Sequence, residues 1–357
     1  MALICRPGEA LPTHRIGQEE YLEAARQGYG GRVEHLEGKL GLMAHTSVKQ
    51  RYCVKPLDTL LLHEGVPRRV DQYLEWAPRL ALRAIGQALS CAQLDTGDIS
   101  ALICTSCTSP GLLLPGLDAY IVAAGGFPNT IRRLPIAQMG CHAGVTALAQ
   151  AHAYLLGHPG EHVVVCCVEL PSLNEQPADL DASSFVSRGL FGDGATAAVV
   201  RGDDRGTGVR ILATGQYLIP GTLNNMCYEL DELGNHFRTK REVVPGLKKG
   251  FPAIHAFLSR AGYQAGDLDF LVSHTGGPRV MDAVMEALGV SEQFMAASRE
   301  SLREVGNLSS AAVLDVLART FEDRYRPRVG AVGLLLGFGP GSTIEMLLGM
   351  WQEGDPS

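Results

Sequence analysis

Residues 135–144 of this 357-residue chain read Pro-Ile-Ala-Gln-Met-Gly-Cys-His-Ala-Gly, and the apolar spacing beyond them predicts a helix from Cys141 to about Leu155. A cysteine in the first turn of a buried helix lies among unpaired backbone amides, which carry partial positive charge. This charge lowers the pKa of the thiol and favours the nucleophilic thiolate. Gly140 and Gly144 would leave room for an acyl chain against the backbone. A buried packing cysteine is the alternative interpretation of Cys141 alone.

The segments around this helix recur in the second half of the chain, offset by about 167 residues. The matching pairs are 102–108 with 270–276, 141–155 with 307–321, and 163–168 with 332–336. Short apolar runs alternate with helical segments, which is typical of an α/β protein. We therefore expect two similar α/β halves, residues 1–205 and residues 206–357, each contributing a strand end and a helix start to one shared site.

Composition argues against several classes of protein. With 46% hydrophobic and 19% charged residues the chain has ordinary globular composition, and its net charge of -7 gives no field that would attract nucleic acid. No run of about 18 apolar residues is present, so no membrane-spanning helix is expected. Arg6 and Pro7 interrupt the N-terminal run before a signal peptide could form, which favours a cytoplasmic protein. Its nine cysteines are then expected to be reduced thiols.

Three local patterns complete the expected organisation. Residues 71–92 carry helical spacing and predict an amphipathic helix, whereas residues 17–45 predict a short helix followed by a loose connection. Cys104 and Cys107 form a Cys-x-x-Cys motif, but no second pair at zinc spacing accompanies it. Because this motif ends a strand-like run instead of opening a helix, we expect it to line the core or a pocket and to hold no metal.

His274 and Asn307 are the other candidate catalytic residues. His274 follows a buried strand and precedes a Gly-Gly-Pro turn, so it lies at a strand end of the kind where α/β proteins build sites. Asn307 begins the helix that the repeat pairs with the helix of Cys141. Taken singly, His274 could be a core histidine and Asn307 a helix cap.

Together with Cys141 these two residues form a chemically complete set. The repeat would bring all three toward one point, where a thiolate can accept an acyl group. A neutral imidazole and a carboxamide can stabilise an enolate and a tetrahedral oxyanion. Decarboxylation of a malonyl thioester then generates the carbanion without a strong base.

On five motifs in order, the chain resembles the chalcone and stilbene synthase superfamily, the type III polyketide synthases, from about residue 3 to Trp351. It is most similar to the bacterial branch that contains tetrahydroxynaphthalene and phloroglucinol synthases. The motifs are Leu-Pro-Ile-Ala-Gln-Met-Gly-Cys (134–141), Gly-Leu-Phe-Gly-Asp-Gly-Ala (189–195), His-Thr-Gly-Gly-Pro (274–278), Gly-Asn-Leu-Ser-Ser (306–310) and Gly-Phe-Gly-Pro-Gly (337–341). The resemblance implies a thiolase-like, duplicated, five-layered α/β/α/β/α fold, a homodimer, and CoA thioesters as substrates with no cofactor.

The resemblance also implies roles for residues around the cavity. Phe191 and Phe237 would be gatekeepers between a CoA tunnel and an elongation cavity, and the 337–341 loop would scaffold that cavity. Further lining residues would be Asn174, Tyr228, Ser309, Leu114 and Cys107. The alternative interpretation of Phe191 is core packing, and that of the loop is a tight turn.

Substrate binding is where the sequence departs from the plant members, which hold the CoA phosphates with several basic residues. Residues 41–49 are nearly neutral, which leaves Lys39, Lys49 and Arg51 as the nearby cations, with Arg279 after the Gly276-Gly277 turn. A starter delivered by an acyl carrier protein is therefore a second possibility beside an acyl-CoA.

The leading hypothesis is iterative condensation of malonyl-CoA onto an acyl or malonyl starter, with cyclisation to a pyrone or a phenolic ring. A single-step ketoacyl synthase III-like enzyme would use the same three residues. Cysteine hydrolases also use Cys, His and Asn in this order, but their Cys-Gly-Ser-Cys-Trp-like stretch is absent. A non-catalytic binding protein is the remaining alternative. The starter is expected to be aliphatic or malonyl.

Overall fold

The structure is a computed structural model that describes residues 2–203 and 205–354. Its centre is a ten-stranded sheet in the order β12-β13-β14-β9-β1-β8-β7-β5-β6, with β2 paired to β8. The strands are β1 (Leu3–Ile4), β2 (Gly8–Ala10), β5 (Ala101–Thr105), β6 (Arg132–Ile136), β7 (His162–Glu169), β8 (Gly194–Arg201), β9 (Gly208–Leu218), β12 (Phe270–Ser273), β13 (Val332–Gly339) and β14 (Thr343–Gln352).

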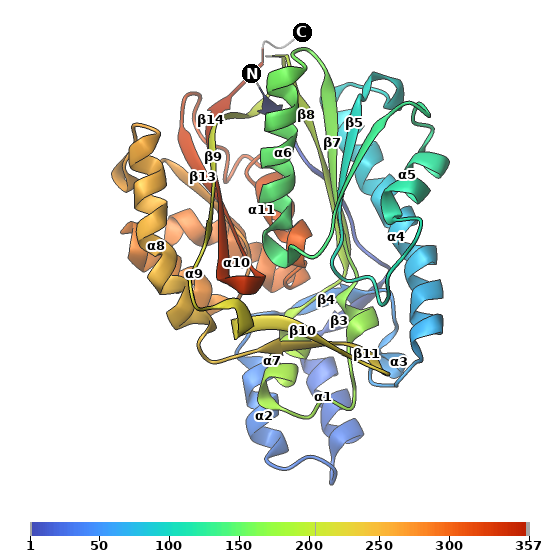
Figure 1. Cartoon of the computed structure of the whole chain (residues 1–357). Helices are drawn as coiled ribbons and strands as arrows, with labels where there is room; N and C mark the ends of the chain where they lie inside the picture. The colour runs from blue at the N-terminus through green and yellow to red at the C-terminus, as the bar shows by residue number, and fades with distance from the viewer. Residues whose placement is uncertain (1, 204, 355–357) are drawn as a thin grey trace.

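The sheet consists of two halves that meet at β1, which pairs antiparallel with both β8 and β9. Each half contains a parallel pair, β5 with β7 in one and β12 with β13 in the other. Two helices, α6 (Ala143–Gly157) and α11 (Ala312–Arg319), lie between the halves (Figure 1). The outer faces are covered by α4 (Val66–Ala92) and α5 (Leu117–Gly125) on one side, and by α8 (Val243–Arg260), α9 (Pro278–Leu288) and α10 (Glu292–Val305) on the other. The predicted five-layered α/β architecture is confirmed.

The central layer is apolar because it is covered on every side. All eight residues of α11 are buried, and so are all residues of β7 from Val163 to Glu169. A strand buried on both faces has no need for alternation, which explains the continuous run of valines and cysteines in β7. One hydrophobic cluster joins α6 and α11 to strands of both halves.

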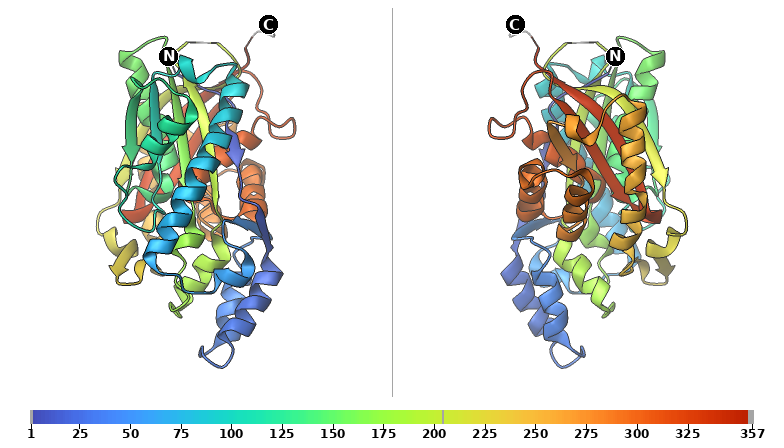
Figure 2. Two further views of the ribbon diagram at one scale, coloured as in Figure 1. Left: turned by 90° about the vertical axis from the view of Figure 1, so that its right-hand side faces the viewer. Right: turned by 90° about the vertical axis from the view of Figure 1, so that its left-hand side faces the viewer.

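The N-terminal region differs from the expectation in one element. The helix predicted over 71–92 is α4, which begins earlier, at Val66. Residues 17–45 contain α1 (Gln18–Tyr29), but the predicted loose connection is wrong, because it includes a second helix, α2 (Leu36–Ala44). Leu40 and Met43 of α2 are buried, and the helix packs beside α7 (Ala182–Leu190). These helices form the narrow end of the molecule (Figure 2).

Short elements complete the structure near the centre. A small sheet pairs β3 (His14–Gly17) with β4 (Gln50–Cys53), which is followed by α3 (Leu57–Leu60). A hairpin of β10 (Met226–Asp231) and β11 (Gly234–Thr239) runs beneath the large sheet (Figure 1). Among the described residues, no helix has the length and apolar character that crossing a membrane requires.

Candidate active site

Cys141 lies where the sequence predicts it, in a short 3-10 turn, η2 (Gly140–His142), that leads into α6. Its side chain is buried, with 7% of the residue exposed. The turn packs against β13 and against η6 (Ser309–Ala311), which leads into α11. The two helix starts predicted by the repeat therefore lie next to each other in the middle layer.

Gly140 and Gly144 allow this close packing; Gly140 also lines the cavity beside Cys141, whereas Gly144 is not among the described lining residues. A Cβ on Gly140, whose φ is +63°, would lie 2.5 Å from Pro340. A Cβ on Gly144 would lie 2.3 Å from the carbonyl oxygen of Ser310. Both positions exclude larger residues because protein backbone and Pro340 occupy the space.

The 337–341 loop also packs against η2. A Cβ on Gly339 would lie 2.4 Å from Cδ2 of His142, and one on Gly337 would lie 3.0 Å from the His142 Cα. Pro340 and Gly341 of the same loop line the cavity beside Cys141. The loop thus combines a tight turn with support for the cysteine.

Asn307 is linked to Cys141 through Ser309. The Asn307 carboxamide oxygen accepts a hydrogen bond from the Ser309 backbone N–H at 2.8 Å, and the Ser309 hydroxyl donates to the Cys141 sulfur at 3.4 Å. The Asn307 backbone is held between Leu190 and Gly192 on either side of Phe191. Ser309 adopts φ +52°, a left-handed conformation that costs a non-glycine residue of order 1 kcal/mol.

His274 follows β12 and is also buried, with 2% exposed. Its backbone N–H donates to Leu336 of β13 at 2.9 Å, and its Nδ1 atom is buried without a hydrogen-bond partner. Burial, with a smaller contribution from the nearby His142, lowers the pKa of His274 to about 3. The unprotonated imidazole is therefore the stable form of this group in the free protein.

Burial raises the pKa of the Cys141 thiol to about 12, against the direction expected from a helix start. The hydrogen bonds of Ser309 and of the Cys141 backbone lower the pKa but do not outweigh the loss of water.

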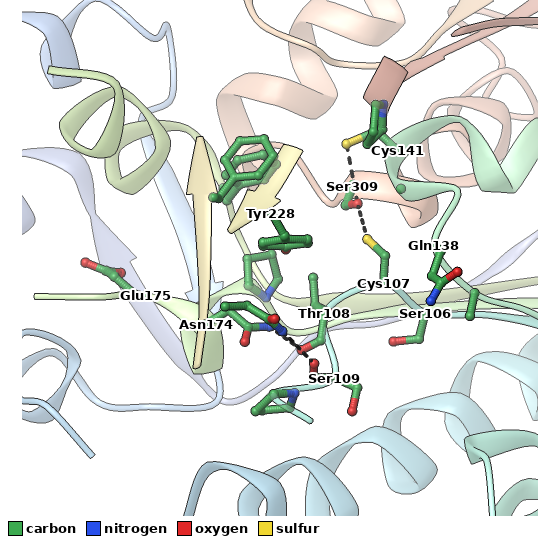
Figure 3. Close-up of a pocket in the computed structure, with 18 of the residues that line it drawn as sticks. Ser106, Cys107, Thr108, Ser109, Gln138, Cys141, Asn174, Glu175, Tyr228 and Ser309 are labelled. Carbon is green, nitrogen blue, oxygen red and sulfur yellow. Dashed lines mark hydrogen bonds between the residues drawn. The ribbon is translucent and has the colours of Figure 1, made fainter. Parts of the chain in front are cut away.

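A cavity of about 870 Å³ opens in front of the cysteine. Phe191, Phe237 and Tyr228 line it as a continuous series of rings: the Phe191 and Phe237 centroids are 5.4 Å apart, and those of Phe237 and Tyr228 are 5.6 Å apart. Asn174 also lines it and donates to the Thr108 carbonyl oxygen at 2.5 Å (Figure 3). A space of this size is typical of small-molecule sites.

The second cysteine of the Cys-x-x-Cys motif faces the same cavity as Cys141. The Cys107 sulfur lies 3.6 Å from the Ser309 hydroxyl, so that Ser309 lies between the two sulfurs (Figure 3). Cys104 lines the cavity too. The described residues hold no cluster suited to a metal ion.

Glu169, at the end of β7, is a buried residue of the site that was not predicted from sequence. Its carboxylate accepts hydrogen bonds from the Thr108 hydroxyl at 2.8 Å, from the Cys107 backbone N–H at 3.2 Å and from the Ser310 hydroxyl. The Cys107 sulfur lies 3.4 Å away. Burial raises the pKa of Glu169 in spite of these donors. A single acidic residue after the apolar run 163–168 was the available signal.

Several predicted residues differ from the expectation in position or exposure. Leu114 is 95% exposed and is not among the described residues that line this cavity. Arg51 lines the cavity, but it is 1% exposed and its guanidinium already donates to Gln18 and to backbone carbonyls of α7. Lys49 and Arg279 are exposed. Gly276 and Gly277 form the turn between His274 and α9, outside the cavity lining.

Comparison with known proteins gives concordant matches over the whole chain. Residues 1–204 match the family described as Chalcone and stilbene synthases, N-terminal domain, and residues 210–350 match Chalcone and stilbene synthases, C-terminal domain. The chain is 41% identical to 1,3,6,8-tetrahydroxynaphthalene synthase of Streptomyces coelicolor, covering 99% of this chain and 94% of the relative. It is 33% identical to phloroglucinol synthase of Pseudomonas fluorescens, covering 98% and 99%. The crystal structure of the S. coelicolor synthase superposes with a TM-score of 0.93 at 40% identity, covering 99% of this chain and 100% of that one.

Proposed function

Since the chain belongs to the chalcone and stilbene synthase family, the type III polyketide synthases, we propose that it condenses malonyl-CoA iteratively onto an acyl-CoA or malonyl starter held on Cys141. The product is a pyrone or phenolic polyketide. The observation that carries this proposal is the position of Cys141. This buried cysteine lies where two helix starts meet, and it lines a cavity of about 870 Å³. A single-step condensing enzyme has no need to house a chain that grows by several units.

Loading of the starter requires Cys141 to lose its proton. Burial alone holds the thiol protonated and the His274 imidazole neutral. We propose that the Cys141 sulfur transfers its proton to His274, which would create a thiolate and an imidazolium whose opposite charges stabilise each other. The thiolate then attacks the starter thioester, and CoA leaves as its thiolate.

Condensation follows from the same groups. The His274 imidazole and the Asn307 NH2 group would donate to the thioester carbonyl oxygen of malonyl-CoA. Loss of carbon dioxide leaves an enolate at that oxygen. Its carbon attacks the acyl group on Cys141, a carbon–carbon bond forms, and the carbon–sulfur bond to Cys141 breaks. Because Ser309 binds the Asn307 oxygen, the NH2 group is turned away from that backbone N–H, which supports this role.

The cavity supports several rounds of extension. We assign Phe191 and Phe237 as the gatekeepers and Asn174, Tyr228, Ser309 and Cys107 as the wall of the elongation cavity. The curated relatives are named for 1,3,6,8-tetrahydroxynaphthalene and phloroglucinol, aromatic products without a side chain. These names support malonyl-CoA as the extender and an aliphatic or malonyl starter.

CoA thioesters act here as substrates, and we propose no cofactor. Lys49, Arg279 and the half-buried Lys39 are the cations that we assign to the CoA phosphates, and Arg51 is left out because it is buried. This sparse set also supports the alternative that an acyl carrier protein delivers the starter. We place the boundary between the halves at residues 205 and 206, between the end of β8 and the start of β9.

A homodimer would cover side chains that this chain leaves exposed. Leu112 and Leu114 are 98% and 95% exposed in the segment between β5 and α5. The adjacent strand β6 forms one edge of the large sheet, and four of its five residues are exposed. Exposed apolar side chains beside a sheet edge favour a partner protein.

Incubation of the purified protein with malonyl-CoA alone, and then with a panel of acyl-CoA starters, tests the proposal by mass spectrometry of the products. We expect polyketides of three or more condensed units. The variant Cys141→Ala should form none of them and should release no CoA above background. Release of CoA by Cys141→Ala at the wild-type rate would contradict the assignment of the nucleophile.

A further inference from the structure

The hairpin of β10 and β11 belongs to the second half of the chain and forms one wall of the cavity. Tyr228 and Phe237 are directly opposite each other in this hairpin, and both line the cavity. Side chains alternate along a strand, so His236, the residue before Phe237, projects from the other face of β11. The position of the two aromatic rings therefore depends on what holds that other face.

His236 is held between two carboxylates. Its Nδ1 atom lies 3.0 Å from Asp179 in the segment before α7, and its Nε2 atom lies 2.8 Å from Asp231 at the end of β10. Only 6% of the His236 side chain and 13% of the Asp179 side chain are exposed, against 52% for Asp231. A neutral imidazole has one N–H donor, whereas this arrangement offers an acceptor to each nitrogen. The geometry therefore fits the imidazolium.

Further hydrogen bonds hold the hairpin in addition to the contacts of His236 with Asp179 and Asp231. Gln176 donates to the hairpin carbonyls of Leu233 and Asn235 at 3.0 and 3.1 Å. The Asn235 carboxamide donates to Ser109 at 3.3 Å. The charged groups around His236 are Asp179 and Asp181 from the segment before α7, Glu229 and Asp231 from β10, Arg238 from β11, Arg188 from α7 and Arg69 from α4.

We propose that Asp179, His236 and Asp231 form a clasp that positions the β10–β11 hairpin and thereby limits the length of polyketide that the cavity accepts. This inference rests on the proposed function. His236 is a positioning residue, since it acts through Phe237 and Tyr228 and does not itself line the cavity. With the clasp open, the aromatic wall moves outward and the cavity admits a longer chain or a bulkier starter.

The charge of His236 makes the clasp sensitive to pH. Burial opposes the positive charge, but the hydrogen bonds to Asp231 and Asp179 outweigh it and raise the pKa of His236. A group whose pKa is raised by folding contributes its full stabilisation below its unfolded pKa and loses it as the pH rises through the folded pKa. The clasp is thus closed in acid and opens toward alkaline pH.

The test compares product distributions of the wild type, His236→Gln and Asp179→Asn at a series of pH values, by mass spectrometry with malonyl-CoA and one acyl-CoA starter. Asp179 itself lines the cavity, so the decisive variant is His236→Gln. Both variants should raise the ratio of longer to shorter products by about two- to fivefold, the scale of one partly exposed ion pair. Asp231→Asn, which removes the more exposed partner, should give a smaller change. In the wild type the same ratio should rise with pH and approach that of His236→Gln, whose ratio should change less.

His255→Gln is the matched control, because the one hydrogen bond of this exposed α8 histidine among the described residues is to the Ala287 carbonyl oxygen, at 2.9 Å. It should leave the distribution unchanged. An unchanged ratio in His236→Gln, or a shift toward shorter products, would overturn the clasp. If His236→Gln does not fold, a wild-type ratio that stays constant with pH also overturns it. Absence of any polyketide from the wild type would instead refute the proposed function.

Discussion

Burial moves the pKa values of Cys141 and His274 in opposite directions, to about 12 and to about 3. The neutral thiol and the neutral imidazole are each the form that a poorly solvated site prefers. If the two groups exchange a proton, the resulting charges compensate each other, and the pair titrates as one system. Removal of the imidazole would leave the Cys141 thiol with a pKa that burial raises.

His274→Gln should therefore suppress alkylation of Cys141 near neutral pH. The wild type should react with iodoacetamide with an apparent pKa far below 12, whereas in the variant the rate should keep rising up to alkaline pH. Peptide mass spectrometry after timed labelling measures this rate for each cysteine. The exposed Cys91 serves as an internal control, and its rate should be the same in both proteins. Identical pH profiles of Cys141 alkylation in both proteins would show that His274 does not activate the thiol.

Among the elements, α6 and α11 have to approach closely for Ser309 to reach Cys141. Gly144→Ala should open this contact, since the added Cβ would meet the Ser310 carbonyl oxygen at 2.3 Å and Val313 at 2.7 Å. We expect a loss of about 1–3 kcal/mol in the free energy of unfolding, together with lower activity. Denaturant unfolding measures the first effect and product formation the second.

The control lies in the same helix. Gly157, the last residue of α6, has no atom within 4 Å of a built Cβ. Gly157→Ala should be neutral or should stabilise the protein by up to about 1 kcal/mol, because alanine is the better helix former. If both variants behave alike, close approach of the two helices is not what requires Gly144.

Elements with a strong apolar period or a repeat were predictable from the sequence. The repeat located the helix starts of Cys141 and Asn307 and the strand before His274, because all three depend on local spacing. The helix α2 was missed because Gly38 and Gly41 lower its helix propensity, and its stability comes from packing beside α7, which the sequence does not display.

The direction in which a side chain points was harder to predict from the sequence. Arg51 was predicted as a nearby cation for the CoA phosphates, but in β4 it shares the buried face with Cys53, two residues later. Glu169 was missed because its place after the apolar run 163–168 signals a buried acid but does not reveal its partners Thr108 and Ser310. The environments of Arg51 and Glu169 both depend on contacts between segments that are distant in the sequence.

The exposure of Leu114 is most informative for the whole molecule. The family resemblance implies that this residue lines a cavity, yet in the single chain 95% of it faces solvent. Both statements hold if a second copy covers the segment between β5 and α5, so we expect a dimer in solution.

Leu114→Lys would place a charge in that interface at a substantial cost in binding free energy. The variant should therefore raise the monomer fraction in sedimentation velocity at micromolar concentration. Val329→Lys, at another exposed apolar residue, should leave the mass unchanged. The prediction that a second copy covers Leu114 would be wrong if the wild type sediments as a monomer. It would also be wrong if Leu114→Lys dimerises as tightly as Val329→Lys.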